Sequence, residues 1–339
     1  MATLYIIGHE PQVNLCSRHL QISDKNGSES RTRRVPLFDI DRVALVGRTR
    51  VSMSVIDALL RRDIPIIMLS RLGGLVGSFS PAREGDAYIR IRQYQNAGNN
   101  QRALPQAAKL VEAKLLNMRR VLQKLGSGEN ASSDRDSLER VLTNLRSLAG
   151  DVRSVQHVDS LRGLEGAGTA AYFGQLSVFF PKDTPFPGRS RRPPRDPANA
   201  LLSFVYTLVM GEIKAAVAAA GLDPCLGCYH AIGYGRPALA LDLIEPLRAP
   251  LCDLFVLRLL NLGIIGREDF ERDEETGGFR MIAGAIKRFF VHYEKRMTRV
   301  FKPVGSVVNT DFRRVMREAA TDYVASMQAN RIVKPFLMP

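Results

Sequence analysis

Two acidic side chains stand three residues apart in a mostly apolar segment, ALALDLIEPLR (residues 238–248). This spacing places Asp242 and Glu245 on one face of a predicted helix. Two carboxylates in apolar surroundings are costly unless a cation or a metal neutralises them. Pro246 and Pro250 remove backbone donors and should bend the helix. The residue types and their spacing therefore predict a cation-binding site.

A histidine and a third acid stand in comparable surroundings. His230 ends the Gly- and Pro-rich connection GLDPCLGCYH (221–230), and Glu165 lies among small residues in LRGLEGAGTAAYFGQLSVFF (161–180). The neighbouring glycines let another backbone or a ligand come close. Three acids and one imidazole from three helical segments predict a site for Mg²⁺ or Mn²⁺, because oxygen ligands suit both metals and imidazole favours Mn²⁺.

A metal held by these side chains would polarise a phosphodiester and stabilise the attacking and leaving oxygens of a displacement. A structural interpretation competes with this one. Asp242 and Glu245 would then pair with Arg248 or Arg258, and His230 would be a capped residue at a helix end. Spacing alone leaves both interpretations open.

The net charge makes a polyanion the expected partner of this chain. Lys and Arg outnumber Asp and Glu by 48 to 34, a formal net charge of +14. A soluble chain this basic usually meets DNA, RNA or an anionic membrane. Membranes fit poorly, since no run approaches about 18 uncharged apolar residues. The N-terminus lacks signal-peptide features and the four cysteines are too few for a disulfide framework, so we expect a cytoplasmic protein.

Two basic segments are candidates for contact with DNA phosphates. The first is RSRRPPR (189–195), where two prolines predict an exposed, extended loop. Its candidate residues are Arg189, Arg191, Arg192 and Arg195, and a solvated linker is the alternative. Asp196 and Pro197 then predict the N-cap and first residue of a long helix that ends near Gly221. Arg248, after the acidic pair, is a further candidate for DNA contact.

The second basic segment is the C-terminal part of the chain. Residues 285–339 contain 11 Lys and Arg against 4 Asp and Glu, a net charge of 11 − 4 = +7. Apolar residues recur there at helical spacing, namely Ile286, Phe289, Phe290, Tyr293 and Met297. This periodicity predicts a folded helix with one basic face, on which Lys287 and Arg288 would contact phosphates. A soluble basic tail is the alternative.

The elements that must position these residues divide the chain near residues 80–88. Short β-branched or aromatic segments predict strands at 3–8, 19–23, 35–40, 42–47, 64–70 and 75–80, with one helix at 51–63. Helical patterns follow, including 106–125 and 137–150. We therefore predict an α+β protein, with a small β-rich domain at 1–84 and a larger all-α catalytic and DNA-binding domain at 85–339.

Three other motifs fit structural roles better. Cys225 and Cys228 form a CxxC pair, but no second pair follows at zinc-binding spacing, so we interpret them as small core residues. His157 lies in a polar segment and is a weak ligand candidate. The stretch SRLGGLVG (70–77) lacks the Gly-Lys-Ser/Thr ending of a phosphate loop and predicts a hairpin turn.

Taken in order, the motifs resemble the CRISPR-associated spacer-acquisition integrases, the large subunit of the adaptation complex. The matching segments are VALVGRTRVSMSVIDALLRRDIPIIMLSRLGGLVGSFSP in the first domain, and LRGLEGAGTAAYF, PANALLSFVYTLV, GLDPCLGCYH and LALDLIEPLR in the second. The resemblance implies metal ligands at Glu165, His230 and Glu245, with Asp242 as an accompanying catalytic acid. The chain after about residue 300 resembles the family less well.

The resemblance also implies a reaction and its partners. The β-domain would mediate homodimerisation, and the helical domain would be catalytic. The 3′-hydroxyl of a captured DNA fragment would attack a phosphodiester at the edge of a CRISPR repeat, with Mg²⁺ or Mn²⁺ activating the hydroxyl. The partners would be double-stranded DNA and the small adaptation subunit. Two dimers of this chain would flank that subunit. A non-catalytic basic DNA-binding scaffold and a plain metal-dependent nuclease are the alternatives.

Overall fold

The structure is a computed structural model that describes residues 3–8, 10–26, 29–81, 87–97, 99–127, 135–190, 193–274 and 276–339. It forms two compact units. Unit 1 combines Met1–Glu84 with Met281–Lys295, and unit 2 combines Gly85–Arg280 with Arg296–Pro339. The α+β class predicted from the sequence is confirmed. Segment 281–295 was expected in the second domain, but it packs with the strand-rich unit 1.

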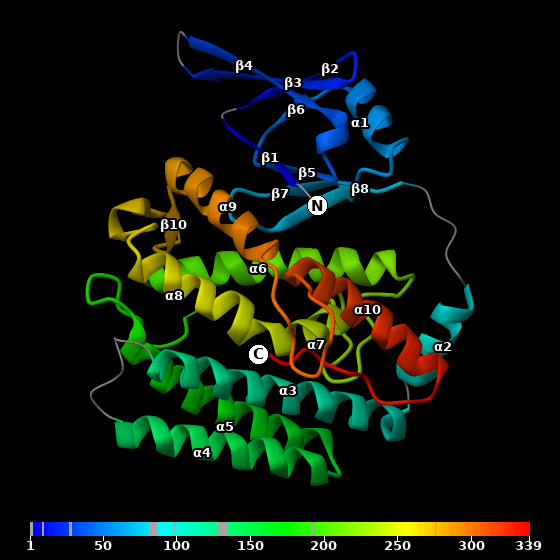
Figure 1. Ribbon diagram of the computed structural model, residues 1–339, viewed down its shortest axis with the longest axis vertical. Helices are drawn as coiled ribbons and strands as arrows, with labels where there is room; N and C mark the ends of the chain where they lie inside the picture. The colour runs from blue at the N-terminus through cyan, green and yellow to red at the C-terminus, as the bar shows by residue number, and fades with distance from the viewer. Residues whose placement is uncertain are drawn as a thin grey trace. The chain divides into compact units, whose positions relative to one another are not determined.

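Unit 1 contains two four-stranded sheets (Figure 1). The first has the order β1 (Thr3–Ile7), β5 (Arg42–Val46), β7 (Ile66–Leu69) and β8 (Leu75–Phe79). The second has the order β4 (Glu29–Pro36), β3 (His19–Asn26), β2 (Gln12–Cys16) and β6 (Arg50–Val51). Strands β1, β5 and β7 are parallel, and β7 pairs with β8 antiparallel through the predicted hairpin turn.

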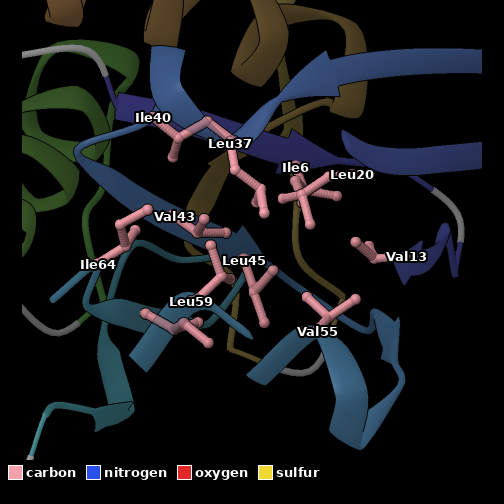
Figure 2. Close-up of a cluster of buried hydrophobic side chains, with 11 residues drawn as sticks. Ile6, Val13, Leu20, Leu37, Ile40, Val43, Leu45, Val55, Leu59 and Ile64 are labelled. Carbon is pink, nitrogen blue, oxygen red and sulfur yellow. The ribbon is translucent and has the colours of Figure 1, made fainter. Parts of the chain in front are cut away.

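Helix α1 (Met53–Leu60) joins the two sheets' apolar side chains into one core (Figure 2). Leu59 of α1 and Leu20 of β3 are fully buried in it. The predicted strand at 35–40 is wrong beyond Pro36, where the 3-10 turn η1 (Leu37–Asp39) begins. Leu37 and Ile40, three residues apart, both reach the core from this turn. The sequence did not predict β2.

Helix α9 (Ala283–Met297) is the helix predicted from the periodicity of the C-terminal segment. All five apolar residues of that pattern are buried, whereas Lys287 and Arg288 are exposed on the other face. The rings of Tyr5 in β1 and Phe290 in α9 have centroids 4.5 Å apart. This aromatic contact explains why the segment joins unit 1 although about 200 residues separate it from the strands.

Unit 2 is mainly helical. Its helices are α2 (Ala87–Ala97), α3 (Asn100–Gly126), α4 (Arg135–Asp151), α5 (Val158–Leu176), α6 (Pro197–Ala219), α7 (Ala238–Leu247), α8 (Leu254–Asn261) and α10 (Phe312–Gln328). Short turns are η2 (Val152–Ser154), η3 (Ser177–Phe179) and η5 (Arg267–Asp269), and β9 (Phe270–Arg272) pairs with β10 (Phe279–Met281). Helices α3, α4 and α5 pack side by side (Figure 1), and α3 also packs on α7.

Helix α6 begins and ends where the sequence predicts. The Asp196 carboxylate accepts a hydrogen bond from the Asn199 N–H at 2.7 Å, and Gly221 follows the helix with φ +79°. By length and composition alone, α6 passes for a membrane-crossing helix. Most of its apolar side chains are buried in the helical unit, and Leu201, Leu202 and Val205 are fully buried. It is therefore a core helix in this fold.

The two prolines of the acidic helix shape the backbone next to the predicted site. Helix α7 ends at Leu247, and the π-helical turn η4 (Arg248–Asp253) follows. In an α-helix the Pro246 carbonyl would accept from the N–H of residue 250, but Pro250 has none. The buried Asn117 side chain of α3 donates to the Pro246 carbonyl instead, at 2.6 Å. It also binds the C-terminal segment, accepting from the Met338 N–H at 2.8 Å.

Candidate metal centre

Two helices and the connection before the second of them bring the predicted residues together in unit 2, whereas the sequence predicted three helical segments. Glu165 comes from α5, Asp242 and Glu245 come from α7, and His230 comes from the connection that precedes α7. His230 Nε2 lies 4.0 Å from Glu245 Oε1. The Glu165 and His230 side chains are 22% and 18% exposed, so both are within reach of solvent, whereas Glu245 is 5% exposed. The site is therefore an inner carboxylate with two more accessible groups beside it.

Asp242 organises the connection that ends in His230. The carboxylate is fully buried, and its Oδ2 accepts hydrogen bonds from the N–H groups of residues 228 and 229 at 2.6 and 3.0 Å. Its Oδ1 accepts from the His230 N–H at 2.9 Å and lies 2.7 Å from His230 Nδ1. Because a carboxylate only accepts, Nδ1 is the donor, and Nε2 of the neutral ring keeps its lone pair for a ligand.

Gly227 makes this arrangement possible because Asp242 lies directly against it. A Cβ atom at residue 227 would collide with the Asp242 carboxylate and would lie 2.8 Å from the Ala238 carbonyl carbon. The second contact is with backbone, which cannot move aside cheaply. The glycine thus lets the connection pack closely on the first turn of α7.

Glu245 is held in its ionised form by two cations. Burial alone would raise the pKa of this carboxyl group, but the charges of Arg248 and Lys114 outweigh burial and lower the pKa to about 2. Arg248 Nε lies 3.0 Å from Glu245 Oε1, and Lys114 Nζ lies 2.6 Å from Oε2. The sequence left open a structural alternative in which the acidic pair contacts Arg248 or Arg258. The pairing of Glu245 with Arg248 agrees with that alternative, and Arg258 is exposed.

The structure adds Lys114, a residue that the sequence did not single out. Its ammonium forms ion pairs with both Glu165 and Glu245, and its side chain is 6% exposed. The signal in the sequence is weak: Lys114 stands in LVEAKLLNM (110–118), where apolar residues surround every polar one. Glu112 in the same stretch is also buried, but it pairs with Lys109 and Arg153.

Lys114 lies between Glu165 and Glu245, so an ammonium group occupies the position between two of the predicted ligands. Across the described residues, no group of three or more His, Cys, Asp or Glu side chains has the spacing of a metal site. The donor set nevertheless fits a divalent cation. Glu245 Oε2 is buried and accepts no hydrogen bond of good geometry, although Lys114 is close. A buried carboxylate oxygen of this kind, beside a second carboxylate and an imidazole, suits Mg²⁺ or Mn²⁺.

A buried polar network lies behind Arg248. Asp253 accepts hydrogen bonds from Tyr172, at 3.0 Å, and from Tyr206. The guanidinium groups of Arg189 and Arg248 lie over the Tyr206 ring, 5.0 and 5.1 Å from its centroid. Burial raises the pKa of Asp253 to about 6, against the hydrogen bonds from the two tyrosines, which lower it. The network fixes Arg248 and hence the orientation of Glu245.

The raised pKa of Asp253 predicts a specific pH dependence of stability. Between about pH 4 and pH 6 the folded protein keeps a proton that the unfolded chain has released, so stability falls as pH rises through this range. The full difference is about 3 kcal/mol. Asp253→Asn should remove this part of the pH dependence, which urea unfolding at pH 4.5, 5.5 and 7 would measure. If the free energy of unfolding changed equally with pH in the variant and the wild type, Asp253 would not be the source of this pH dependence.

The candidate DNA-contacting residues lie in different surroundings. Arg189 is half-buried and donates to the Asn199 side chain at 2.8 Å, and Arg248 is held by Glu245. Both are engaged within the fold. Arg195 is exposed beside α6, and Lys287 and Arg288 are exposed on α9 of unit 1, with Lys287 4.0 Å from Asp24. Arg191 and Arg192 lie outside the described residues.

The remaining candidates do not join the centre. His157 is exposed where α5 begins, and its side chain makes no capping hydrogen bond. Cys225 and Cys228 are half-buried free thiols. Burial and the nearby Asp242 carboxylate raise the pKa of the Cys228 thiol well above its usual range, so the neutral thiol is favoured. This agrees with a packing role.

Comparison with known proteins gives one consistent family. A profile of the family described as CRISPR associated protein Cas1 matches residues 4–295. A CRISPR-associated endonuclease Cas1 from Thermodesulfovibrio yellowstonii is 31% identical over 300 residues, which cover 87% of this chain and 91% of that relative. Several further relatives are fusions of a Cas4 exonuclease with a Cas1 endonuclease, and this chain spans about half of their length.

Solved structures share the fold. A chain of a Cas6-RT-Cas1–Cas2 complex is 25% identical with a TM-score of 0.76, and the match covers 97% of this chain and 35% of that one. A casposase bound to its integration product is 22% identical with a TM-score of 0.82, and the match covers 100% of this chain and 94% of that one. At this identity, the likeness to the casposase shows a shared fold and nothing more.

Proposed function

Since the chain belongs to the CRISPR-associated protein Cas1 family, we propose that it is a metal-dependent DNA endonuclease and integrase that inserts DNA fragments into a CRISPR array. The supporting observation is that Glu165 and Glu245 share one cation, the Lys114 ammonium, and that His230 Nε2 lies 4.0 Å from Glu245 Oε1. The family match supplies the class of enzyme, and this grouping of side chains supports the choice of Glu165, His230 and Glu245 as the catalytic centre.

In this proposal Glu165, His230 Nε2 and Glu245 hold Mg²⁺ or Mn²⁺. When bound, the metal would activate the attacking 3′-hydroxyl and stabilise the leaving oxygen. Asp242 is a positioning residue here, although the sequence placed it among the catalytic group. It is fully buried, and its hydrogen bonds among the described residues go to the connection at residues 228–230, so it acts on the reaction through the His230 ring. Arg248 orients Glu245 in the same way.

The proposed partners are double-stranded DNA, a second copy of this chain and a small adaptation subunit, with the cytoplasm as the place of action. The net charge of +14 favours a polyanion. A related chain of known structure occurs in a complex with Cas2, which supports a small partner for this chain. Unit 1 is the proposed dimerisation domain. The proposed catalytic domain would begin where unit 2 begins, at Gly85.

A strand-transfer assay tests the proposed function against its alternatives. The full chain would be mixed with the small partner, a short duplex with 3′-hydroxyl ends, a plasmid with a CRISPR repeat, and Mn²⁺ or Mg²⁺. Covalent joining of the duplex to the repeat is the expected result. Cleavage without joining would indicate a plain nuclease, and binding alone would indicate a DNA-binding scaffold.

The loop at 189–195 gives a prediction about DNA binding. Replacing Arg191 and Arg192 by alanine should weaken duplex binding and flatten its salt dependence, because each lost phosphate contact lowers the slope of log K against log salt by about 0.9. Fluorescence anisotropy over a salt series measures this slope. Arg61→Ala, an exposed residue of unit 1 that pairs with Asp57, is the matched control. An unchanged slope would make the loop a linker.

A further inference from the structure

Lys114 contacts both carboxylates that the proposed function assigns to the metal. Its Nζ forms an ion pair with Glu165 Oε1 and lies 2.6 Å from Glu245 Oε2. We propose that Lys114 is an exchangeable internal counter-ion. Its ammonium keeps the two carboxylates together in the metal-free protein and leaves when a divalent cation binds. This inference rests on the proposed metal-dependent function and concerns how the centre is kept ready for the metal.

The charges of the site favour exchange over addition. Asp242, Glu245 and Glu165 provide three negative charges, and Lys114 and Arg248 provide two positive ones. With His230 neutral, a divalent ion beside a retained ammonium would leave a net positive charge in a largely buried site. Exchange of the ammonium for the ion leaves the site neutral. Two cations competing for the same carboxylate oxygens also repel each other strongly in surroundings of low dielectric constant.

The backbone around Lys114 is fixed, so the side chain is the part that can move. Asn117, one helical turn further along α3, is fully buried and ties α3 to the Pro246 carbonyl at 2.6 Å. Pro246 directly follows Glu245, so this bond fixes the distance between the helices that hold the lysine and the carboxylate. A lysine has a flexible four-carbon stem, which allows its ammonium to withdraw without a change in the fold.

The carboxylates keep other partners when the ammonium withdraws. Glu245 Oε1 remains bonded to Arg248 Nε at 3.0 Å, and Glu165 Oε1 accepts a hydrogen bond from the Thr169 hydroxyl at 3.0 Å. Glu245 Oε2 has Lys114 as its near neighbour and accepts no well-formed hydrogen bond. Glu245 Oε2 is therefore the oxygen that becomes free to bind the metal when the Lys114 ammonium withdraws.

The test measures metal binding and stability of the full chain without DNA. Lys114→Met keeps the apolar stem and removes the charge that competes with the metal. Isothermal titration calorimetry should show Mn²⁺ bound at least about tenfold more tightly than by the wild type. In EDTA the variant should unfold at a lower temperature, because two carboxylates lose a shared cation, and Mn²⁺ should raise its unfolding temperature by more than that of the wild type.

Two further variants keep the result interpretable. Lys109→Met is the matched control, since Lys109 lies on the same helix and pairs with Glu112 at 2.8 Å, and it should leave Mn²⁺ affinity unchanged. Lys114→Arg retains the charge and should bind Mn²⁺ less tightly than Lys114→Met. If Lys114→Met is unfolded in EDTA, we expect Mn²⁺ to restore the fold, and failure to do so would overturn the inference.

The outcomes separate the inference from the proposed function. Equal or weaker Mn²⁺ binding by Lys114→Met, with a wild type that binds Mn²⁺, would show that the lysine does not compete with the metal and would overturn the inference alone. A wild type that binds neither Mn²⁺ nor Mg²⁺, and a Lys114→Met variant that behaves in the same way, would overturn the proposed metal centre together with it.

Discussion

Alanine at Glu165, His230 or Glu245 is expected to lower the rate of DNA joining by at least about a thousandfold, the equivalent of roughly 4 kcal/mol of transition-state stabilisation. Each substitution removes one of three proposed metal ligands. DNA binding should change little, because the three side chains are a small part of a surface whose charge is set by Lys and Arg. Single-turnover strand transfer measures the rate, and anisotropy with the same duplex measures binding.

The three variants should differ in stability, which gives a second readout. Glu245 is 5% exposed and faces two cations, so its removal leaves Lys114 and Arg248 without their shared partner. Glu165 is 22% exposed and its loss should cost less. Glu139→Ala, at an exposed position of α4, is the control and should join DNA normally. Full joining by His230→Ala would contradict the assignment of the metal ligands.

The spacing of the acidic pair was informative about the site, but only in part. Three-residue spacing correctly placed Asp242 and Glu245 on one side of α7. It could not reveal that they have different partners, because Asp242 faces the backbone of residues 228–230 and Glu245 faces α3. Which face of a helix meets which neighbour depends on tertiary packing, and periodicity within one helix contains no information about that packing.

Lys114 shows the same limit more clearly. The sequence predicted its helix at 106–125, within α3 (Asn100–Gly126). Fifty-one residues separate Lys114 from Glu165, and no local pattern distinguishes it from Glu112, which is also buried. Lys114 pairs with Glu165 in the candidate metal centre, whereas Glu112 pairs with Lys109 and Arg153. Buried charges in an apolar helix can be recognised from sequence, whereas their partners cannot.

The fold was predictable where the signal is local. The hairpin of β7 and β8, the Asp196 cap of α6 and the apolar face of α9 follow from residues close together in the chain. The packing of α9 in unit 1 does not, because it depends on contacts such as that of Phe290 with Tyr5. The turn at Leu37–Asp39 replaced the end of the strand predicted at 35–40, since apolar residues at 37 and 40 fit a turn as well as a strand.

Asp242→Asn is expected to weaken Mn²⁺ binding and slow joining, each by about 10- to 100-fold, the usual effect of losing a group that orients a metal-binding histidine. The carboxylate uses two oxygens to accept four hydrogen bonds, three from backbone N–H groups and one from His230 Nδ1. An amide has one oxygen, and its NH₂ group would face donors. The connection of residues 228–230 would lose its fixed form, and the ring would lose the partner that sets its tautomer.

Calorimetric Mn²⁺ titration, joining rates over a Mn²⁺ series and circular dichroism together test this role. If Asp242 acts through His230, a high Mn²⁺ concentration should restore part of the joining rate of Asp242→Asn, because weak binding is then the main defect. Asp269→Asn is the matched control: Asp269 is also buried and accepts from the Gly266 N–H at 3.0 Å, but it caps a turn away from the proposed ligands. A joining rate that stays low at saturating Mn²⁺, in a folded variant with wild-type affinity, would instead make Asp242 a group that acts on the DNA itself.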